Sequence, residues 1–338
     1  ESWLLFDGGS GLAQPGGGWQ GAAPFHEGVV WVDTEAPGQG WPEAPPESRY
    51  LHAALASGLR DNLAKQGLEA VVVGLSGGID SAVVAALASE VLGPDRVLGV
   101  ALPTRYTSAE SLSLAQEQAH HLGMHTLCLD AEAPFEGAVA SLTSAWPGRR
   151  FGLTDENLQS RARGMLLIAL TSEPAVHERL GSSRVAVLNT GNKSEAATGY
   201  FTLYGDGIGA FGVLGDCLKG RVFALARELG DAIPAGVLNR KPTAELAPGQ
   251  TDEASLAPYP QLDAILGTLL EAQVAEEEVS DRLADILDGA ELAGARGHLP
   301  RILRLLRATE FKRRQLPFNL KVSPKAFGHG RRIPLTSR

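Results

Sequence analysis

The most informative stretch of the chain is Gly74-Leu75-Ser76-Gly77-Gly78-Ile79-Asp80-Ser81. It follows an apolar, β-branched run at 71–73, typical of a short buried strand, and precedes a segment whose apolar residues recur at helical spacing. A strand, a glycine-rich turn and a helix bring backbone N–H groups together on an anion, because glycine permits close approach and the helix N-terminus is positively polarised. We therefore expect this stretch to bind phosphate, with the hydroxyls of Ser76 and Ser81 donating to it and Asp80 holding a cation.

Two other phosphate-binding motifs do not fit this stretch. A Walker-type loop requires a lysine before its serine or threonine, and a dinucleotide fingerprint requires G-x-G-x-x-G. Residues 207–212 do satisfy the second pattern, but a poor strand precedes them and Gly215 and Gly220 interrupt the helix after them, so we expect no dinucleotide fold there. Residues 74–81 instead resemble the SGGxDS loop of the N-type ATP pyrophosphatases, which cut ATP between its α- and β-phosphates and transfer AMP to a substrate oxygen.

The composition is that of an ordinary globular protein, with 338 residues, of which 44% are hydrophobic and 20% charged, and a net charge of −9. The acidic balance argues against general nucleic-acid binding, although the tail from Arg301 onward is basic and suits either a nucleic acid or a polyanionic small ligand. The sequence has two cysteines, so we expect no disulfide framework and a reducing, cytoplasmic compartment, with Cys128 in the core. No apolar run is long enough to span a membrane. The chain begins with neither a signal peptide nor a methionine, which we interpret as a fragment or a processed product.

Strands and helices are predicted to alternate from residue 70 to about residue 230, which is typical of a parallel sheet with helices on both faces. Predicted strands cover 97–102, 125–129 and 185–189, and predicted helices cover 50–66, 109–122 and 156–170. Ligands of such sheets gather at the carboxyl ends of the strands. We therefore expect the turns at Ser76, at 103–105 and at 190–192 to converge.

The two ends of the chain have a different character. Apolar runs at 3–6 and 29–32, separated by glycine-rich turns, are too short to form a core of their own, and the proline-rich residues 37–47 are predicted to be a linker. After the sheet region, 241–260 is predicted to be a mobile loop, and helical spacing returns in the C-terminal part of the chain.

A second turn leaves the predicted strand at 185–189 and reads Asn189-Thr190-Gly191-Asn192-Lys193-Ser194-Glu195. Glu195 is a candidate to share a cation with Asp80, because Mg²⁺ on nucleotides takes one or two protein carboxylates together with phosphate oxygens. The alternative is a solvated glutamate in the first turn of a helix, where the helix dipole favours a negative charge.

Seven motifs together resemble a single family. In chain order they are GLSGGIDSAVVAAL, LPTRYTSAESL, ENLQSRARG, NTGNKSE, TLYGDG, RKPTAEL and EFKRRQ. Their order and spacing, from about residue 45 to the C-terminus, are similar to those of the glutamine-hydrolysing NAD synthetases. The resemblance implies an α/β fold with a Rossmann-like parallel sheet, similar to the adenine nucleotide alpha hydrolases, plus C-terminal helices. It also implies that ATP adenylates the nicotinate carboxylate of deamido-NAD⁺ and that ammonia then displaces AMP.

The same resemblance implies which residues form the site. It gives Asp80 and Ser76 catalytic roles and makes Asp80 and Glu195 the ligands of Mg²⁺. The residues it places at ATP are Gly74, Leu75, Ser76, Gly77, Gly78, Ile79, Asp80, Ser81, Thr190, Lys219 and Thr243. The residues it places at deamido-NAD⁺ are Asn157, Arg161, Glu195, Tyr200, Phe201, Thr202, Leu203, Tyr204, Gly205 and Lys312. Arg161, Lys219 and Lys312 supply the positive charge that two phosphate-bearing substrates require.

A domain organisation is implied as well. Residues 49–338 would be the synthetase domain, 36–48 a linker and 1–35 the end of a nitrilase-like glutaminase domain whose catalytic cysteine, glutamate and lysine would lie upstream. Leu203 stands where the shorter, ammonia-dependent members place a lysine, which agrees with the glutamine-dependent branch. This polypeptide is expected to use ammonia, to form at least a homodimer, and to bind neither nucleic acid nor membrane.

Two other functions stay open on the sequence. A tRNA-modifying enzyme can adenylate a base with the same kind of loop, but the acidic charge and the lack of an RNA-binding motif or paired catalytic cysteines count against it. A nucleotide-binding module without activity is the second alternative, and the presence of every candidate ATP and magnesium residue counts against it.

Overall fold

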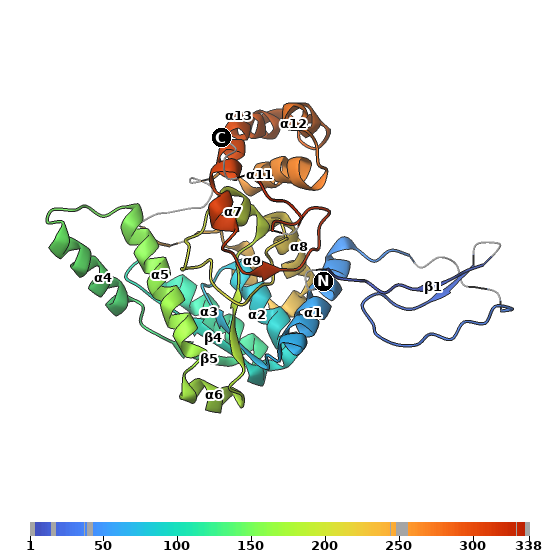
Figure 1. Cartoon of the computed structure of the whole chain (residues 1–338), viewed down its shortest axis with the longest axis horizontal. Helices are drawn as coiled ribbons and strands as arrows, with labels where there is room; N and C mark the ends of the chain where they lie inside the picture. Colours follow the sequence, from blue (N-terminus) through green and yellow to red (C-terminus); the bar gives the residue numbers. More distant parts are fainter. Residues whose placement is uncertain are drawn as a thin grey trace.

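The computed structural model describes residues 4–14, 18–36, 38, 43–243, 245–247, 256–328 and 330–334. At its centre lies a six-stranded parallel sheet with the strand order β5-β4-β3-β6-β7-β8 (Figure 1). The strands are β3 (Ala70–Gly74), β4 (Val97–Ala101), β5 (His125–Cys128), β6 (Val185–Asn189), β7 (Phe211–Gly212) and β8 (Phe318–Asn319). Helices cover both faces of this sheet, so the predicted α/β class with a Rossmann-like parallel sheet is confirmed.

Strand β3 is buried on both sides because its side chains alternate between two hydrophobic clusters. Val71 and Val73 belong to one cluster, and Ala70 and Val72 belong to the other. The helices of the first cluster are α1 (Glu47–Gln66), α2 (Ile79–Leu92), α3 (Ala109–Leu122), α8 (Lys219–Glu228) and α9 (Ala235–Asn239). Those of the second are α5 (Leu153–Leu170) and α6 (Pro174–Leu180). The unbroken apolar run that predicted the strand is the consequence of this burial on both faces.

A third hydrophobic cluster belongs to the C-terminal helices, which form the upper part of the molecule in Figure 1. The elements of this layer are α11 (Tyr259–Leu266), η3 (Gly267–Glu271), α12 (Glu276–Arg282), α13 (Gly289–Ala308) and α14 (Glu310–Arg313). Leu262 and Ile265 of α11 share the cluster with Leu299 and Ile302 of α13. The predicted C-terminal helices are therefore confirmed.

Most of the predicted elements are confirmed, and α3 and β6 have the predicted bounds. Helices α4 (Glu132–Ala145) and α6 were not predicted. In α4 the apolar residues Phe135, Val139 and Leu142 recur at helical spacing, but Phe135 is the one buried residue of the helix. This short stripe is a signal from which the helix could have been predicted. Helix α5 begins at Leu153, before the predicted residue 156, and this first residue is itself exposed.

The prediction that Cys128 lies in the core is wrong, because its side chain is exposed. Strand β5 is at the edge of the sheet, and its residues alternate between half-buried and exposed. An apolar neighbourhood in sequence therefore does not bring Cys128 into the core, since alternate residues of an edge strand point to opposite sides.

The N-terminal residues form an arm that extends away from the sheet on the right of Figure 1. It contains a two-stranded antiparallel sheet of β1 (Gly11–Ala13) and β2 (Trp19–Gly21). The apolar run at 29–32 forms no strand, and Trp31 is 92% exposed. The arm meets the remainder of the chain through a parallel bridge between Leu4 and Lys321 and a hydrogen bond from the Tyr50 hydroxyl to Asp7.

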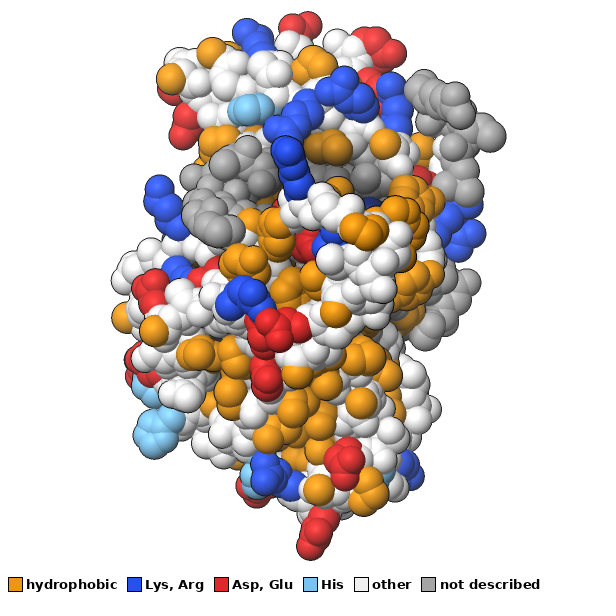
Figure 2. Space-filling view, turned by 90° about the vertical axis from the view of Figure 1, so that its left-hand side faces the viewer, with side chains coloured by type: hydrophobic (Ala, Val, Ile, Leu, Met, Phe, Trp, Pro, Cys, Tyr) orange, Lys and Arg blue, Asp and Glu red, His pale blue; other side chains and the backbone are white. Residues whose placement is uncertain are grey.

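Hydrophobic side chains gather on the face that carries α4 and α5, which is turned toward the viewer in Figure 2. The exposed apolar side chains of α5 are Leu153, Met165 and Ile168, and Phe151 and Tyr204 are exposed too. Among the described residues, no helix combines the length and the apolar character needed to cross a membrane.

Candidate active site

A cavity of about 290 Å³ lies at the carboxyl ends of β3, β4 and β6, and we call it the loop cavity. From β3 the sheet continues to β4 on one side and to β6 on the other, and ligands of such sheets bind at this change of direction. Of the residues predicted at ATP, those that line the cavity are Gly74, Leu75, Ser76, Gly78, Ile79, Asp80, Ser81, Thr190, Lys219 and Thr243. The predicted convergence of the turns after β3 and β6 is thus confirmed. From the turn after β4, Leu102 and Thr107 line the cavity, on either side of the predicted 103–105.

The glycine-rich loop is closed by its own two serines. The Ser81 hydroxyl donates to the carbonyl of Gly78 at 3.0 Å and lies 3.2 Å from the Ser76 hydroxyl, which accepts from the Gly78 N–H at 3.2 Å. Helix α2 begins directly after Gly78, which has no side chain to cap it. The first N–H groups of α2 therefore face the cavity as an anion-binding end, with both hydroxyls beside them.

Gly77 lines no part of the cavity, but its backbone explains why glycine stands there. Its φ of +71° lies in the left-handed region, and a Cβ at this position would be 2.4 Å from the carbonyl oxygen of Ser111. Any side chain would therefore push the loop away from the start of α3. Gly77 supports the phosphate loop from behind.

Two carboxylates and one ammonium converge at the mouth of the loop. The Lys219 ammonium lies 2.5 Å from Asp80 Oδ2 and 3.8 Å from Glu195 Oε1. Asn192 caps α7 (Lys193–Thr198) in a capping box with Glu195, and its side-chain amide donates to Asp80 Oδ1 at 3.0 Å. Asp80 and Glu195 thus share one positive group, and their oxygens are the hard donors that Mg²⁺ prefers.

The residues predicted at deamido-NAD⁺ gather around the turn at 199–206, beside α5 and α14. Arg161 of α5 donates to the Leu203 carbonyl at 3.2 Å, and Asn157 accepts from the Thr202 hydroxyl at 2.8 Å. Lys312 of α14 donates to the carbonyls of Gly199 at 2.9 Å and Phe201 at 2.8 Å. Burial lowers the pKa of Lys312, and the charge of Asp206 partly restores it.

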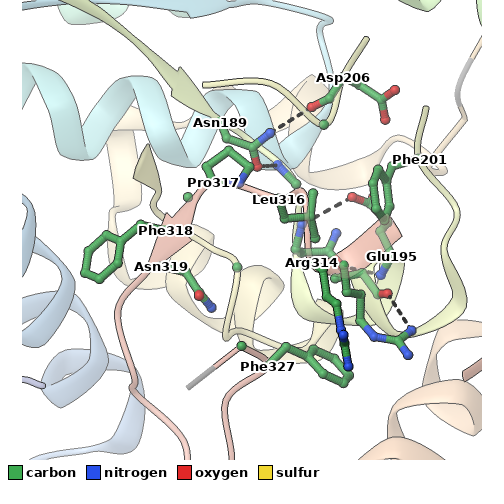
Figure 3. A pocket seen from close by; sticks show the side chains of 18 of the residues that line it. Asn189, Glu195, Phe201, Asp206, Arg314, Leu316, Pro317, Phe318, Asn319 and Phe327 are labelled. Carbon is green, nitrogen blue, oxygen red and sulfur yellow. Dashed lines mark hydrogen bonds between the residues drawn. The ribbon is translucent and has the colours of Figure 1, made fainter. Parts of the chain in front are cut away.

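Tyr200 and Gly205 line the loop cavity, whereas Phe201 lines a second cavity of about 470 Å³ that we call the C-terminal cavity (Figure 3). The two cavities have Asn189, Gly191, Glu195 and Asp206 in common. In Figure 3 the Asn189 amide is hydrogen-bonded to the backbone of Asp206, and the donor–acceptor distance is 2.8 Å. Glu195 therefore lies where a ligand in one cavity meets a ligand in the other.

The basic residues of the C-terminal tail do not form one surface patch. Arg313, Arg314 and Arg332 line the C-terminal cavity, but Arg313 is largely buried, and its guanidinium donates to Glu310, to the Thr309 hydroxyl and to the carbonyl of Ala197. Burial lowers the pKa of Arg313, and the carboxylate of Glu310 partly offsets this. Part of the positive charge of the C-terminal tail therefore binds groups of the protein itself.

A model of the family described as NAD synthase matches residues 51–316. The chain belongs to the NAD synthase family. The glutamine-dependent NAD(+) synthetase of Thermotoga maritima is 40% identical over 302 residues, which are 87% of this chain and 49% of that protein. The enzyme of the same name from Synechocystis is 40% identical over 345 residues, or 98% of this chain and 58% of that protein. The chain spans about half the length of the curated relatives it matches.

Solved structures agree with this family. A glutamine-dependent NAD⁺ synthetase from Acinetobacter baumannii in complex with ADP has a TM-score of 0.59 and 31% identity, covering 94% of this chain and 56% of that one. An NMN synthetase from Francisella tularensis has a TM-score of 0.60 and 27% identity, covering 79% of this chain and 95% of that one.

Several residues around the loop cavity were not predicted from the sequence. Glu245 accepts from the Ser111 hydroxyl at 2.7 Å and from Arg240 at 2.7 Å, and all three line the loop cavity. Arg163 donates to the Leu102 carbonyl at 3.0 Å beneath the same cavity. These residues lie within the motifs LPTRYTSAESL, ENLQSRARG and RKPTAEL. Because these motifs also contain or adjoin predicted contacts, their remaining polar residues could have been predicted to line the same site.

Proposed function

We propose that this chain amidates deamido-NAD⁺ to NAD⁺ with the consumption of ATP. A nicotinate carboxylate oxygen attacks the α-phosphorus of ATP and pyrophosphate leaves. Ammonia then attacks the adenylated carbonyl carbon, AMP leaves with the bonding electrons, and a proton is lost to give the amide. The observation that carries the proposal is the convergence of Asp80, Glu195 and Lys219 beside a phosphate loop, in a chain of the NAD synthase family.

ATP is assigned to the loop cavity. The N-terminus of α2 and the hydroxyls of Ser76 and Ser81 are placed to receive phosphate oxygens. Lys219, nearly buried and directed at Asp80, is placed to balance the negative charge that grows at the α-phosphate in the transition state. Thr190 and Thr243 on the wall of the cavity offer further hydroxyl donors.

Asp80 and Glu195 are proposed to hold Mg²⁺. Their carboxylates already share one cation in this structure, and two such ligands suffice when phosphate oxygens complete the coordination sphere. Bound there, the ion would neutralise charge on the phosphates.

Deamido-NAD⁺ is proposed to reach the reacting phosphate from the side of Glu195. The C-terminal cavity, with Phe201, Arg314 and Arg332 on its wall, meets the loop cavity at Glu195 and Asp206. The predicted contacts Thr202, Leu203 and Tyr204 belong to the turn at 199–206, and the predicted contacts Asn157, Arg161 and Lys312 are hydrogen-bonded to it. Aromatic rings and guanidinium groups suit a ligand with planar bases and a pyrophosphate.

A homodimer is proposed through the face of α5. Leu153 is 71% exposed and lies on that helix with Met165 and Ile168, and hydrophobic side chains gather on this face in Figure 2. Exposed apolar side chains gathered in this way mark protein–protein contacts. We expect the doubly substituted Met165→Asp/Ile168→Asp protein to sediment as a monomer where the unsubstituted protein sediments as a dimer.

The division of the chain into a synthetase domain at 49–338, a linker at 36–48 and a nitrilase-like remainder at 1–35 stays a prediction. The family match, which begins at residue 51, and the separate two-stranded sheet of the arm support it. Membership of the NAD synthase family argues against the RNA-modifying alternative.

The proposal is tested by incubating the protein with deamido-NAD⁺, ATP, MgCl₂ and ammonium chloride, then measuring NAD⁺ and pyrophosphate. We expect both products in equal amounts, and none from Gly77→Ala, whose Cβ would displace the loop. Pyrophosphate release that depends on transfer RNA and not on deamido-NAD⁺ would show that the proposed substrate is wrong. Nicotinate mononucleotide, offered in place of deamido-NAD⁺, tests whether the adenylate half of the dinucleotide is needed.

A further inference from the structure

Lys193 is a fully buried lysine next to the proposed metal ligands, and no step of the proposed reaction uses it. Its ammonium lies 2.9 Å from Asp216, 2.8 Å from Glu271 and 2.7 Å from the Ser323 hydroxyl. A buried ammonium is costly unless charges and hydrogen bonds compensate it fully. Here three groups from three separate parts of the chain do so.

The partners of Lys193 are themselves fixed. Asp216 accepts from the backbone N–H groups of Val322 and Ser323 at 2.9 and 2.8 Å, and from the Ser323 hydroxyl at 2.8 Å. The Lys193 N–H donates to the Cys217 carbonyl at 2.9 Å. The first residue of α7 is thereby tied to the turn before α8 and to the segment after β8.

Helix α7 needs such an anchor because it has six residues, too few to be stable on its own. The residue before Lys193 is Asn192, which donates to Asp80, and two residues after it is Glu195. The position of Lys193 therefore sets where both of these side chains lie relative to Asp80.

The same network reaches the start of α8, which carries Lys219. Ser194 accepts from the Lys219 N–H at 3.0 Å and donates to Asp263 at 2.6 Å, and Asp263 also accepts from the Gly220 N–H at 2.6 Å. Burial raises the pKa of Asp263, while the hydrogen bond from Ser194 opposes this. The N-termini of α7 and α8 are thus held together by buried polar groups.

We propose that Lys193 is a positioning residue that fixes the separation of Glu195 from Asp80 and so sets the affinity of the site for Mg²⁺-ATP. An apolar side chain would fill the same space as Lys193. Ion pairs and hydrogen bonds to three groups also fix the direction in which the side chain and the start of α7 point, which packing alone does not. The inference rests on the proposed function, since it gives Asp80 and Glu195 the metal.

The test compares Lys193→Met with the milder Ser323→Ala, which removes one hydroxyl from the network. The matched control is Arg221→Met, which takes a cation from the same carboxylate, Glu271, without touching α7. For each protein, calorimetry gives the Kd of ATP with and without MgCl₂, the assay gives the Mg²⁺ concentration at half-maximal activity, and thermal unfolding reports stability.

We expect Lys193→Met to need about tenfold more Mg²⁺, and Ser323→Ala a few times more, with the Kd of metal-free ATP unchanged in both. Arg221→Met should match the unsubstituted protein. If Lys193→Met does not fold, the Mg²⁺ dependence of ATP binding in Ser323→Ala tests the inference by itself. For each protein, the Kd of ATP without MgCl₂ is divided by the Kd with MgCl₂. If this ratio is the same in Lys193→Met and Ser323→Ala as in Arg221→Met, the inference is overturned, whatever the thermal stability. Failure of the unsubstituted protein to make NAD⁺ would instead overturn the proposed function.

Discussion

Asp80 is the residue on which both turns of the site depend. One of its oxygens accepts from the Asn192 amide of the second turn, and the other lies beside the Lys219 ammonium. Its side chain is 18% exposed and lines the loop cavity, so its charge is available to a ligand there. A change that removes the charge and keeps the shape therefore separates its chemical role from its structural one.

We expect Asp80→Asn to keep the fold and to lower kcat/KM on the order of a hundredfold or more, because a transition-state charge interaction is lost. Initial rates of NAD⁺ formation at saturating MgCl₂ measure this, with Asp95→Asn as a control at an exposed aspartate outside both cavities. Near-normal turnover of Asp80→Asn would place the metal elsewhere.

Lys312 is a predicted contact of the dinucleotide, and it also donates hydrogen bonds to the turn at 199–206 that supplies other predicted contacts. We expect Lys312→Ala to raise KM for deamido-NAD⁺ roughly tenfold and KM for ATP much less, because the carbonyls of Gly199 and Phe201 lose their donor while the phosphate loop at 74–81 keeps its own contacts. Steady-state kinetics with each substrate varied in turn checks this. Lys321→Ala, in the segment after β8, is the control, and a loss of kcat with both KM values unchanged would move Lys312 toward the chemical step.

Residues 240–243 and 245–246, which we call the strap, form one wall of the loop cavity. Glu245 holds the strap to the start of α3 by accepting from Ser111, and it also accepts from Arg240 within the strap. Arg240 in turn donates to the Gly77 carbonyl at 3.4 Å. Glu245 itself has a φ of +47°, in the left-handed region that non-glycine residues seldom adopt. Such a conformation persists where its surroundings hold it, and here the holding contacts lead directly to the phosphate loop.

We expect Glu245→Gln to raise the Kd of ATP about tenfold, because the ion pair with Arg240 is lost and the donors on Ser111 and Ser108 no longer meet a charged carboxylate. Glu110→Gln is the control, since Glu110 is exposed and lies 3.9 Å from the same Arg240. Equal ATP affinity in the two variants would mean that the strap stays in place without its charge.

The acid dependence of the strap is a consequence of the same contacts. Burial raises the pKa of Glu245, but hydrogen bonds from Ser111 and Ser108 and the charge of Arg240 outweigh it, so the pKa is lowered. Because the contacts of the attached strap favour the charged form of Glu245, they stabilise the attached strap at pH values above the ordinary carboxyl pKa. This stabilisation is lost as the pH falls through the lowered pKa of Glu245. ATP affinity should therefore be constant through neutral pH and fall in acid, and calorimetry across that range should show a smaller fall in Glu245→Gln, in which the contribution of Glu245 is absent.

The whole polypeptide combines a synthetase fold with an arm that holds no catalytic cysteine. Release of ammonia from glutamine in a nitrilase-like site needs an activated cysteine. Cys217 is buried beside Asp216, and burial raises the pKa of its thiol, while Cys128 lies on the edge strand β5. Neither has the surroundings of an activated nucleophile.

We therefore expect this polypeptide to make NAD⁺ from ammonium and not from glutamine. The measurement offers each as the only nitrogen source after removal of free ammonia. The double variant Cys128→Ser/Cys217→Ala serves as the matched control and should behave like the parent with ammonium. Synthesis from glutamine at the rate seen with ammonium would reveal a glutaminase site within these 338 residues.

The amino-acid sequence was sufficient to predict the features that depend on near neighbours. The β-branched run of β3, the bounds of α3 and β6, and the phosphate loop between β3 and α2 all result from local spacing and from glycine at fixed positions. The sheet topology then brings the turns after β3 and β6 together, since carboxyl ends of parallel strands lie at one edge.

The tertiary structure alone decided which charged side chains are buried and what they hold. Nothing in the local sequence marks Lys193 or Arg313 as buried, yet Lys193 is buried against Ser323 and Arg313 against Ala197, each more than a hundred residues away along the chain. Conversely, Cys128 reads as core and lies exposed at the edge of the sheet. The reason is that burial of a side chain depends on which distant segment packs against it, and local spacing carries no record of that partner.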